Sequence, residues 1–294
     1  MKSHLPPWLL VLRPHQWLKN LLVFVPLVAS HRFEADIIIH SLLAFIAFSF
    51  TASAVYVVND VKDVEADRAH PRKRFRPFAS GALPVSRAPL LLAALLVPGF
   101  AIAIWTGILF AGSLILYLAI SAAYSYRLKG KPILDVCILA GLYTWRIVAG
   151  GLATGITLSV WLLAFSIFFF LALAAVKRQA ELVDRLKCGE ELAPGRGYHV
   201  SDLPIIAGMA MAAGYVSVLV MALYVNSPHI ADLYKHPAAL WGVCLVLLYW
   251  ISHVVLTAHR GLMHDDPLVF ALRDGISRFC VLLMAAFLAG GTFL

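Results

Sequence analysis

An uncharged stretch in the first half of the chain restricts the fold more than any other feature. Residues 88–126 contain no Asp, Glu, Lys or Arg over 39 positions. As a single helix they would be about 58 Å long, nearly twice the thickness of the hydrocarbon core of a bilayer. The stretch therefore predicts two membrane-spanning helices, joined by a turn near residues 105–107.

Long apolar runs recur along the whole chain and predict an all-α membrane protein. Of the 294 residues, 61% are hydrophobic and 14% are charged, which is typical of a polytopic helical membrane protein. Residues 133–176 are again long enough for two spans, with the turn in the region 150–157, where glycines supply flexible backbone. Nine spans are expected in a single domain, residues 1–294, and the other five cover residues 16–31, 36–58, 203–225, 238–259 and 275–294.

The distribution of positive charge predicts the orientation of these spans. Of the 24 Lys and Arg residues, 21 fall in segments that the nine-span order places on one side of the membrane. Only Arg32 and Lys235 fall on the other side, and Arg146 lies within the fifth span. Since positive charge accumulates on the cytoplasmic side, we expect a cell (inner) membrane protein with its N-terminus in the cytoplasm and its C-terminus outside. The polar loops after the second, fourth, sixth and eighth spans can then converge on one cytoplasmic site.

The net charge and the cysteines exclude several other classes of protein. A formal charge of +8 could attract nucleic acid, but the basic residues sit in short segments between apolar runs, where membrane topology accounts for them. The four cysteines form no CxxC pair, so neither a disulfide framework nor a zinc site is indicated. A cleaved signal peptide is not expected, because no clear small-residue cleavage site follows the first apolar residues.

The most informative polar segment, residues 59–81, follows the second span and reads NDVKDVEADRAHPRKRFRPFASG. On a helix, Asp60, Asp63 and Asp67 would lie within an arc of roughly 60° on one face. Such a row of carboxylates repels itself in water, whereas a bound divalent cation would turn the repulsion into coordination. The row therefore predicts a metal site. The alternative is a solvated helix end whose acids only balance nearby cations.

Basic residues follow the acidic row closely. Lys73, Arg74 and Arg76 are suited to binding phosphate oxygens. Carboxylates, a hard metal ion and basic residues together suggest a diphosphate site. Between the two groups, His70 and Pro71 are expected to end the helix by ordinary turn chemistry.

Polar residues near the later spans leave alternatives open. In the basic loop 124–131, Arg127 and Lys129 either bind phosphate or only set the membrane topology. Arg146, inside a span, needs a partner, which is either an aspartate or an anionic substrate. The HDD triplet at residues 264–266 precedes a proline, and three adjacent side chains cannot all face one metal from a helix. We therefore expect a capped turn there.

A second polar segment follows the sixth span. Lys177, Glu181 and Asp184 would share one helix face. This pattern is either an ion-paired helix end or a second polar wall, in which Lys177 and Arg178 meet phosphate and the acids meet metal or hydroxyl groups.

These motifs together resemble a known family. The RPHQWLKN segment at residues 13–20, the NDxxDxxxD motif from Asn59, the HPxKxxRPxAxG sequence at residues 70–81 and the nine spans are similar to the UbiA superfamily of intramembrane prenyltransferases. The resemblance covers nearly the whole chain and implies a UbiA-like bundle with a cytoplasmic polar cap. Members bind a polyprenyl diphosphate through magnesium held by two Asp-rich motifs. By this resemblance the metal residues are Asn59, Asp60, Asp63 and Asp67.

One departure from the family pattern points to a particular branch. Aromatic-prenylating members carry a second acidic motif after the sixth span, whereas this chain has KRxxE from Lys177 to Glu181. That segment, RGYHxSDLP at residues 196–204 and HDDPLVFALRD at residues 264–274 resemble the decaprenyl-phosphate phosphoribosyltransferases. Those enzymes transfer a 5-phosphoribosyl group from phosphoribosyl diphosphate (PRPP) to a polyprenyl phosphate, in a pathway to cell-wall polymers.

This resemblance implies the same reaction here, with Mg²⁺ as cofactor, PRPP and polyprenyl phosphate as substrates, and the lipid bilayer as surroundings; a homo-oligomer stays open. With the residue patterns, it gives Asn59, Asp60, Asp63 and Lys177 as catalytic residues, and as substrate-binding residues Lys19, Lys73, Arg76, Tyr124, Arg127, Arg146, Arg178, Glu181 and Asp184. The alternatives are an aromatic polyprenyltransferase of quinone biosynthesis and a transporter, for which the sequence shows no inverted repeat.

Overall fold

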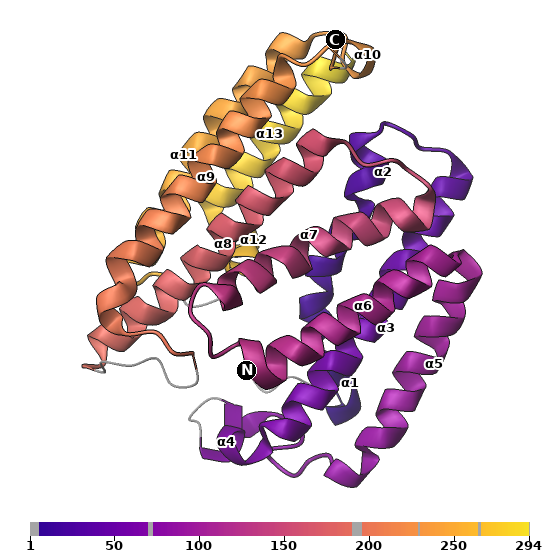
Figure 1. The fold of residues 1–294 in the computed structure, drawn as a ribbon, viewed down its shortest axis with the longest axis vertical. Coiled ribbons are helices and arrows are strands. Elements are labelled where there is room, and N and C mark those ends of the chain that lie inside the picture. Colours follow the sequence, from indigo (N-terminus) through magenta and orange to yellow (C-terminus); the bar gives the residue numbers. More distant parts are fainter. Residues whose placement is uncertain (1–5, 70–72, 190–195, 229, 264–265, 294) are drawn as a thin grey trace. The chain divides into compact units, whose positions relative to one another are not determined.

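The computed structural model describes residues 6–69, 73–189, 196–228, 230–263 and 266–293, and over these residues the chain is helical without any strand (Figure 1). The all-α class is therefore confirmed for this part of the chain. The chain divides into two compact units. The first consists of Met1–Tyr126 and Trp145–Thr157, and the second of Arg127–Thr144 and Leu158–Leu294.

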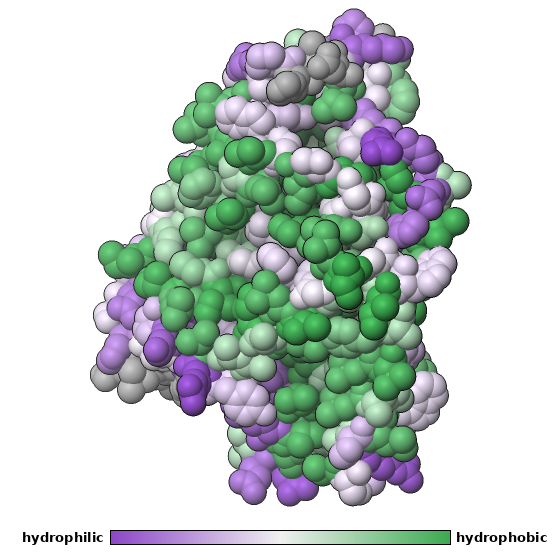
Figure 2. Space-filling view, turned by 45° about the vertical axis from the view of Figure 1, so that its right-hand side comes forward, coloured by the Kyte–Doolittle hydropathy of each residue, from purple (hydrophilic) through white to green (hydrophobic). Residues whose placement is uncertain are grey.

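Eight helices in the described part are long and apolar enough to cross a membrane. They are α3 (Ala35–Lys62), α5 (Ala88–Thr106), α6 (Ile108–Ala123), α7 (Leu134–Thr154), α8 (Val160–Lys187), α9 (Leu203–Val225), α11 (Leu240–His259) and α13 (Gly275–Phe293). Figure 2 shows hydrophobic residues over much of the visible face, with hydrophilic ones gathered in groups toward its edges. These features fit a multi-pass membrane protein, as the composition predicts.

The turn predicted near residues 105–107 is confirmed, and the one predicted in 150–157 lies at the end of that region, because α7 continues through Gly150 and Gly151 to Thr154. Gly107 alone separates α5 from α6, and residues 155–159 separate α7 from α8. Gly155 has a φ of 68°, a left-handed conformation that favours glycine. The remaining expected span, residues 16–31, corresponds to the 3₁₀ helix η1 (Pro14–Phe24) followed by α2 (Val25–Ala29). These two elements are not among the eight spanning helices, so a ninth crossing stays a prediction.

In the first unit, α3 is the central helix. It packs against α1 (Pro7–Leu12), η1, α5 and α6. Small residues such as Ala44, Ala47 and Ala54 on its buried face let neighbouring backbones approach closely. Since α3 continues beyond its apolar part to Lys62, its last turns carry the beginning of the acidic motif.

The polar segments of the first unit lie at one end of α3. The chain between α3 and α5 contains α4 (Val64–Ala69) and the 3₁₀ turns η2 (Lys73–Phe75) and η3 (Val85–Arg87). Lys62 donates from Nζ to the carbonyl oxygen of Ser125 at 2.8 Å, in the π-helical turn η4 (Tyr124–Leu128) that follows α6. The loops after the second and fourth expected spans therefore share one end of this unit, in agreement with the predicted topology.

In the second unit, α8, α9, α11 and α13 pack side by side (Figure 1). Short helices join them at their ends, namely η5 (Val200–Asp202), α10 (Ile230–Leu233), η6 (Pro237–Ala239) and α12 (Pro267–Arg273). Lys187, the last residue of α8, donates from Nζ to the carbonyl oxygens of Arg260 at 3.1 Å and Gly261 at 3.3 Å, just beyond α11. The loops after the sixth and eighth expected spans thus share one end of this unit. Their cytoplasmic location remains a prediction.

We predict that Gly150 on α7 cannot carry a side chain. A Cβ there would lie 2.1 Å from the carbonyl oxygen of Val23 in η1, whereas a Cβ at Gly141 on the same helix would meet nothing within 4 Å. Gly150→Ala should therefore destabilise the protein by about 1–3 kcal/mol through overpacking. Gly141→Ala is the matched control and should not lower the melting temperature. Thermal unfolding in detergent measures both, and equal melting temperatures would contradict the close packing of α7 on η1.

Candidate functional site

The acidic motif bends the chain slightly but keeps its helical spacing. Helix α3 ends at Lys62, Asp63 caps it, and α4 begins at Val64. The backbone N–H of Asp63 donates to the Asn59 carbonyl oxygen at 2.9 Å, and that of Asp67 donates to the Asp63 carbonyl oxygen at 2.7 Å. Asp60 and Asp67 consequently point the same way, and both are buried.

One arginine bridges the two buried carboxylates. Nη1 of Arg76 lies 3.2 Å from Oδ1 of Asp60 and 2.6 Å from Oδ2 of Asp67. Asp60 and Asp67 therefore lie on a common face, as their spacing predicts. Arg76, expected from the sequence to bind phosphate, lies between the two carboxylates in this structure and supplies the positive charge that balances them.

A second arginine, absent from the sequence-based assignment, completes this cluster. Arg13 ends α1 with a φ of 51°, and its Nη2 lies 2.5 Å from Oδ1 of Asp60. Its guanidinium carbon also lies 5.1 Å from the ring centroid of Tyr56. The only sequence signal was the position of Arg13 at the start of the RPHQWLKN segment, because 47 residues separate it from Asp60.

The donors of the acidic cluster suit magnesium together with a phosphate ligand. Among the described residues, no group of three or more His, Cys, Asp or Glu side chains could by itself hold a metal ion. Mg²⁺ is usually bound through one or two carboxylates plus substrate phosphates, rather than by an all-protein cage. Asp60 and Asp67 offer two converging carboxylates of this kind, so the residues present fit the ion.

The other candidate site residues of the first unit differ in their exposure to solvent. Lys73 is exposed in η2, and Tyr124 is partly buried in η4. His70 and Pro71 lie outside the described residues. Asn59 and Asp63 are partly buried at the end of α3, next to Asp60.

A buried polar cluster surrounds Arg146 inside the first unit. Its Nε donates to Oδ1 of Asn20 at 3.0 Å, and its Nη2 donates to the hydroxyl of Tyr117 at 3.2 Å. The guanidinium also lies 5.2 Å from the ring centroid of Phe48. Lys19, the neighbour of Asn20, is buried too. Asn20 and Tyr117 are neutral, so these two contacts hydrogen-bond the guanidinium of Arg146 within a span.

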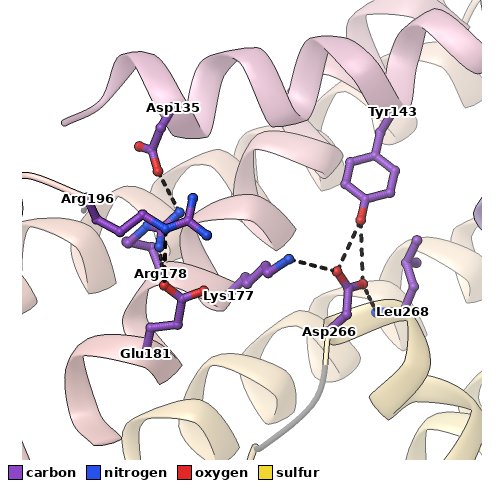
Figure 3. Close-up of polar contacts among 8 residues, drawn as sticks. All are labelled: Asp135, Tyr143, Lys177, Arg178, Glu181, Arg196, Asp266 and Leu268. Carbon is purple, nitrogen blue, oxygen red and sulfur yellow. Dashed lines mark hydrogen bonds and ion pairs between the residues drawn. The ribbon is translucent and has the colours of Figure 1, made fainter. Parts of the chain in front are cut away.

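The second polar cluster surrounds Arg178 on α8 (Figure 3). Nη2 of Arg178 lies 2.5 Å from Oδ2 of Asp135, and both side chains are fully buried. Nη1 of Arg178 pairs with Glu181, which lies 4.0 Å from Nε of Arg196. The second half of α8 is therefore ion-paired, as one of the two interpretations predicted, but Glu181 pairs with Arg178 and not with Lys177. Asp135 was not assigned from the sequence, although an acid at the start of an apolar span requires a partner.

Lys177, next to Arg178, belongs to a different set of contacts (Figure 3). Its Nζ lies 3.2 Å from Oδ2 of Asp266, whose carboxylate also accepts from the hydroxyl of Tyr143 at 3.3 Å and from the backbone N–H of Leu268. Asp266 is thus the N-cap of α12, which confirms the capped turn before Pro267 for this residue. The other two residues of the triplet, His264 and Asp265, lie outside the described residues.

The two neighbouring cations differ in access to solvent. The side chain of Lys177 is 32% exposed, and that of Arg178 is 0% exposed. Lys177 can therefore reach a ligand, whereas Arg178 is enclosed by its carboxylate partners. Asp184 lies half-buried on the next turn of α8, and Arg127 is exposed at the end of η4.

Two residues of the second unit lie beside Asp135, namely Ile133, whose backbone is strained, and Tyr198, whose side chain is buried. Ile133 has a φ of 65°, and a non-glycine residue in this region costs about 1–3 kcal/mol. Its N–H donates to the hydroxyl of Tyr198 at 2.7 Å, and that hydroxyl donates to Oδ1 of Asp135 at 2.6 Å. Burial, with the hydrogen bond to Asp135, raises the pKa of Tyr198. The phenol therefore stays protonated and acts as a donor at physiological pH.

Several known proteins are similar to this chain in sequence. Residues 21–271 match the UbiA prenyltransferase family. The protein y4nM of Sinorhizobium fredii is 39% identical over 97% of this chain and 56% of its own length. The nodulation protein NoeC of Azorhizobium caulinodans is 39% identical over 93% of this chain and 89% of its own. The decaprenyl-phosphate phosphoribosyltransferase of Mycolicibacterium smegmatis is 43% identical over 58% of this chain and 55% of its own. The chain thus spans little more than half the length of two of these relatives.

The same fold occurs in solved structures. A UbiA homologue from Archaeoglobus fulgidus, bound to DMAPP and Mg²⁺, matches 97% of this chain and 97% of its own with a TM-score of 0.68 and 17% identity. At this identity the likeness shows the fold alone.

We predict that the adjacent residues Lys177 and Arg178 contribute very differently to stability. Arg178→Met would leave Asp135 buried without its cation, which costs about 3–5 kcal/mol. Lys177→Met removes a partly exposed ion pair and should cost about 1 kcal/mol or less. Unfolding of the two variants in the same detergent measures this difference. An equal loss of stability in both would contradict the distinction drawn between their environments.

Proposed function

The chain belongs to the UbiA prenyltransferase family, and from this premise we propose that it transfers the 5-phosphoribosyl group of PRPP to a polyprenyl phosphate, such as decaprenyl phosphate. Pyrophosphate is the leaving group, and Mg²⁺ is the cofactor. The reaction would take place at the cytoplasmic face of the cell membrane, because the distribution of positive charge in the sequence predicts the polar loops there.

The observation that carries the proposal is Lys177 in the second half of α8, a cation that is partly exposed to solvent. Where a second acidic motif would hold a second metal, this chain has Lys177 and Arg178, and the carboxylates near them are already engaged in ion pairs. A positively charged position of this kind favours direct contact with a phosphate group over a second magnesium clamp. The identity to the M. smegmatis phosphoribosyltransferase supports the same choice, over the part of the chain that it covers.

We propose that the acidic cluster binds PRPP, the donor of the phosphoribosyl group. Asp60 and Asp67, supported by Asn59 and Asp63, would hold Mg²⁺, which when bound neutralises charge on the pyrophosphate. Arg76 would then exchange its carboxylate contacts for the phosphate oxygens of PRPP, and Arg13, which contacts the same oxygen of Asp60, would do the same. Lys73 is suited to the 5-phosphate, because it is exposed on the adjacent turn η2.

The bond changes require no strong general base. An oxygen of the lipid phosphate forms a bond to C1 of the ribose, while the bond from C1 to the pyrophosphate oxygen breaks and its electron pair leaves with the pyrophosphate. The attacking oxygen is already anionic. Positioning and electrostatic stabilisation would therefore supply most of the rate acceleration.

The remaining assigned residues would bind the acceptor and support the site. Lys177 is exposed enough to meet a phosphate, and so is Arg127 near the end of η4. Arg178, held by Asp135 and Glu181, is better suited to organising the end of α8 than to touching substrate. Lys19 and Arg146 are proposed to attract an anionic group toward the first unit from within the membrane.

The decisive experiment gives the purified protein two substrate pairs in separate reactions with Mg²⁺. One is radiolabelled PRPP with polyprenyl phosphate, and the other is polyprenyl diphosphate with 4-hydroxybenzoate. We expect a ribosylated lipid from the first pair and no product from the second. A prenylated aromatic product without ribosylated lipid would replace the proposal by the aromatic prenyltransferase reaction. Product formation without any gradient across a membrane would exclude a transporter.

We predict that the carboxylate of Asp60 is essential and that of nearby Glu65 is not. Asp60→Asn keeps the shape but removes the charge that Mg²⁺ requires, so transfer should fall by at least about 10³-fold. Glu65 is exposed on α4 in the same motif, and Glu65→Gln is therefore the matched control. Initial rates over a range of Mg²⁺ concentrations measure both variants. Wild-type turnover by Asp60→Asn would remove Asp60 from the metal site.

A further inference from the structure

Tyr198, a buried residue outside the assigned site, connects three segments of the second unit. Its side chain is 1% exposed, and its hydroxyl joins Asp135 at the start of α7 to the backbone of Ile133. The guanidinium carbon of Arg178 on α8 lies 5.4 Å from the centroid of the Tyr198 ring, and Nη2 of Arg178 donates to the other carboxylate oxygen of Asp135. The phenol therefore ties the loop after α8, the end of α8 and the start of α7 together.

The residues before α7 form a basic turn, defined as residues 127–133, which carries Arg127, Lys129 and Lys131. Its last residue is the strained Ile133, whose N–H is held by Tyr198. β-Branched side chains rarely adopt a positive φ, so Ile133 would relax if nothing opposed it. The strained residue of the basic turn is thus held by a hydrogen bond from outside the turn, in addition to the backbone bond inside it from the Lys131 N–H to the Leu128 carbonyl oxygen at 3.1 Å.

The neighbour of Tyr198 supports the basic turn directly. Gly197 has a φ of 70°, and a Cβ there would lie 2.4 Å from the carbonyl oxygen of Gly130 and 3.1 Å from Cδ of Pro132. The backbone at Gly197 therefore lies against the middle of the basic turn. Two consecutive residues of the RGYH sequence contact the turn, one through its hydroxyl and one through its backbone.

We propose that Tyr198 is a positioning residue, which fixes the basic turn so that Arg127 meets a substrate phosphate in one defined geometry. Tyr198 would not touch the substrate. The inference rests on the proposed function in one respect, namely that the basic turn binds a phosphate group of a substrate. If Tyr198 only filled space in the core, its ring would matter and its hydroxyl would not.

Limited trypsin digestion tests the positioning without any enzymatic assay. Trypsin can cut after Arg127 and Lys129, whereas Lys131 precedes Pro132 and is resistant. In Tyr198→Phe, loss of the hydrogen bond to the Ile133 N–H should make cleavage at these two sites about tenfold faster, with other sites unchanged. Unchanged cleavage, or equally faster cleavage along the whole chain, would overturn the proposal.

Two further variants distinguish a local effect on the basic turn from a general folding defect. Tyr234 is a buried tyrosine between α9 and α11, at the other end of those helices, so Tyr234→Phe is the matched control and should not alter cleavage in the basic turn. Gly197→Ala leaves the hydroxyl of Tyr198 in place but pushes against Gly130, and should expose the same two sites. If Tyr198→Phe does not fold, this variant decides, and protection equal to wild type would overturn the proposal.

A double-mutant cycle then connects the turn to the reaction. Tyr198→Phe should raise KM for PRPP or for polyprenyl phosphate while kcat changes by less than about threefold. In the background of Arg127→Ala, Tyr198→Phe should raise KM no further, because both changes remove the same contact. Fully additive effects would overturn the link to the substrate. If wild-type protein ribosylates no lipid, the proposed function fails, whereas the digestion result still decides whether Tyr198 fixes the turn.

Discussion

The polar architecture of this protein depends on the cost of burying charge. An ionised group that leaves water loses several kcal/mol of hydration unless an opposite charge and hydrogen bonds replace it. Asp60, Asp135 and Arg178 are almost inaccessible to solvent, and each meets a partner from another segment. These ion pairs fasten helix ends and loops that lie far apart in the sequence. The same ion pairs therefore order the helix ends and hold together the two polar clusters around Asp60 and Arg178.

Those features of the fold that follow from local chemistry could be predicted from the sequence. The length of the uncharged stretch 88–126 requires a turn, and the only residue between α5 and α6 is Gly107. The three- and four-residue spacing of the acidic row requires a common face, which Asp60 and Asp67 share. The first apolar segment was predicted as one membrane span, but it consists of the 3₁₀ helix η1 followed by the short α2. Its apolar residues do not indicate where one helix type changes to the other.

The partners within each cluster could not be predicted in the same way. Arg13 lies 47 positions from Asp60, and Lys177 lies 89 positions from Asp266, so only the packing of helices brings them together. Asp135 and Tyr198 illustrate the same limit, because neither stands in a motif with an evident chemical role. The sequence does reveal that a charged residue at a membrane boundary needs a partner. The sequence does not reveal which residue is the partner. The partner and its burial decide whether a cation such as Arg178 is enclosed or, like Lys177, stays accessible to solvent.

The adjacent positions 177 and 178 have a consequence for the evolution of this fold. Arg178 is locked to Asp135, so a change at either residue should persist only if the other changes with it. Lys177 is held at the surface by Asp266 and is free of that restriction. Selection can therefore act on one codon while its neighbour stays fixed by the fold. Position 177 is open to change without loss of the buried ion pair between positions 135 and 178.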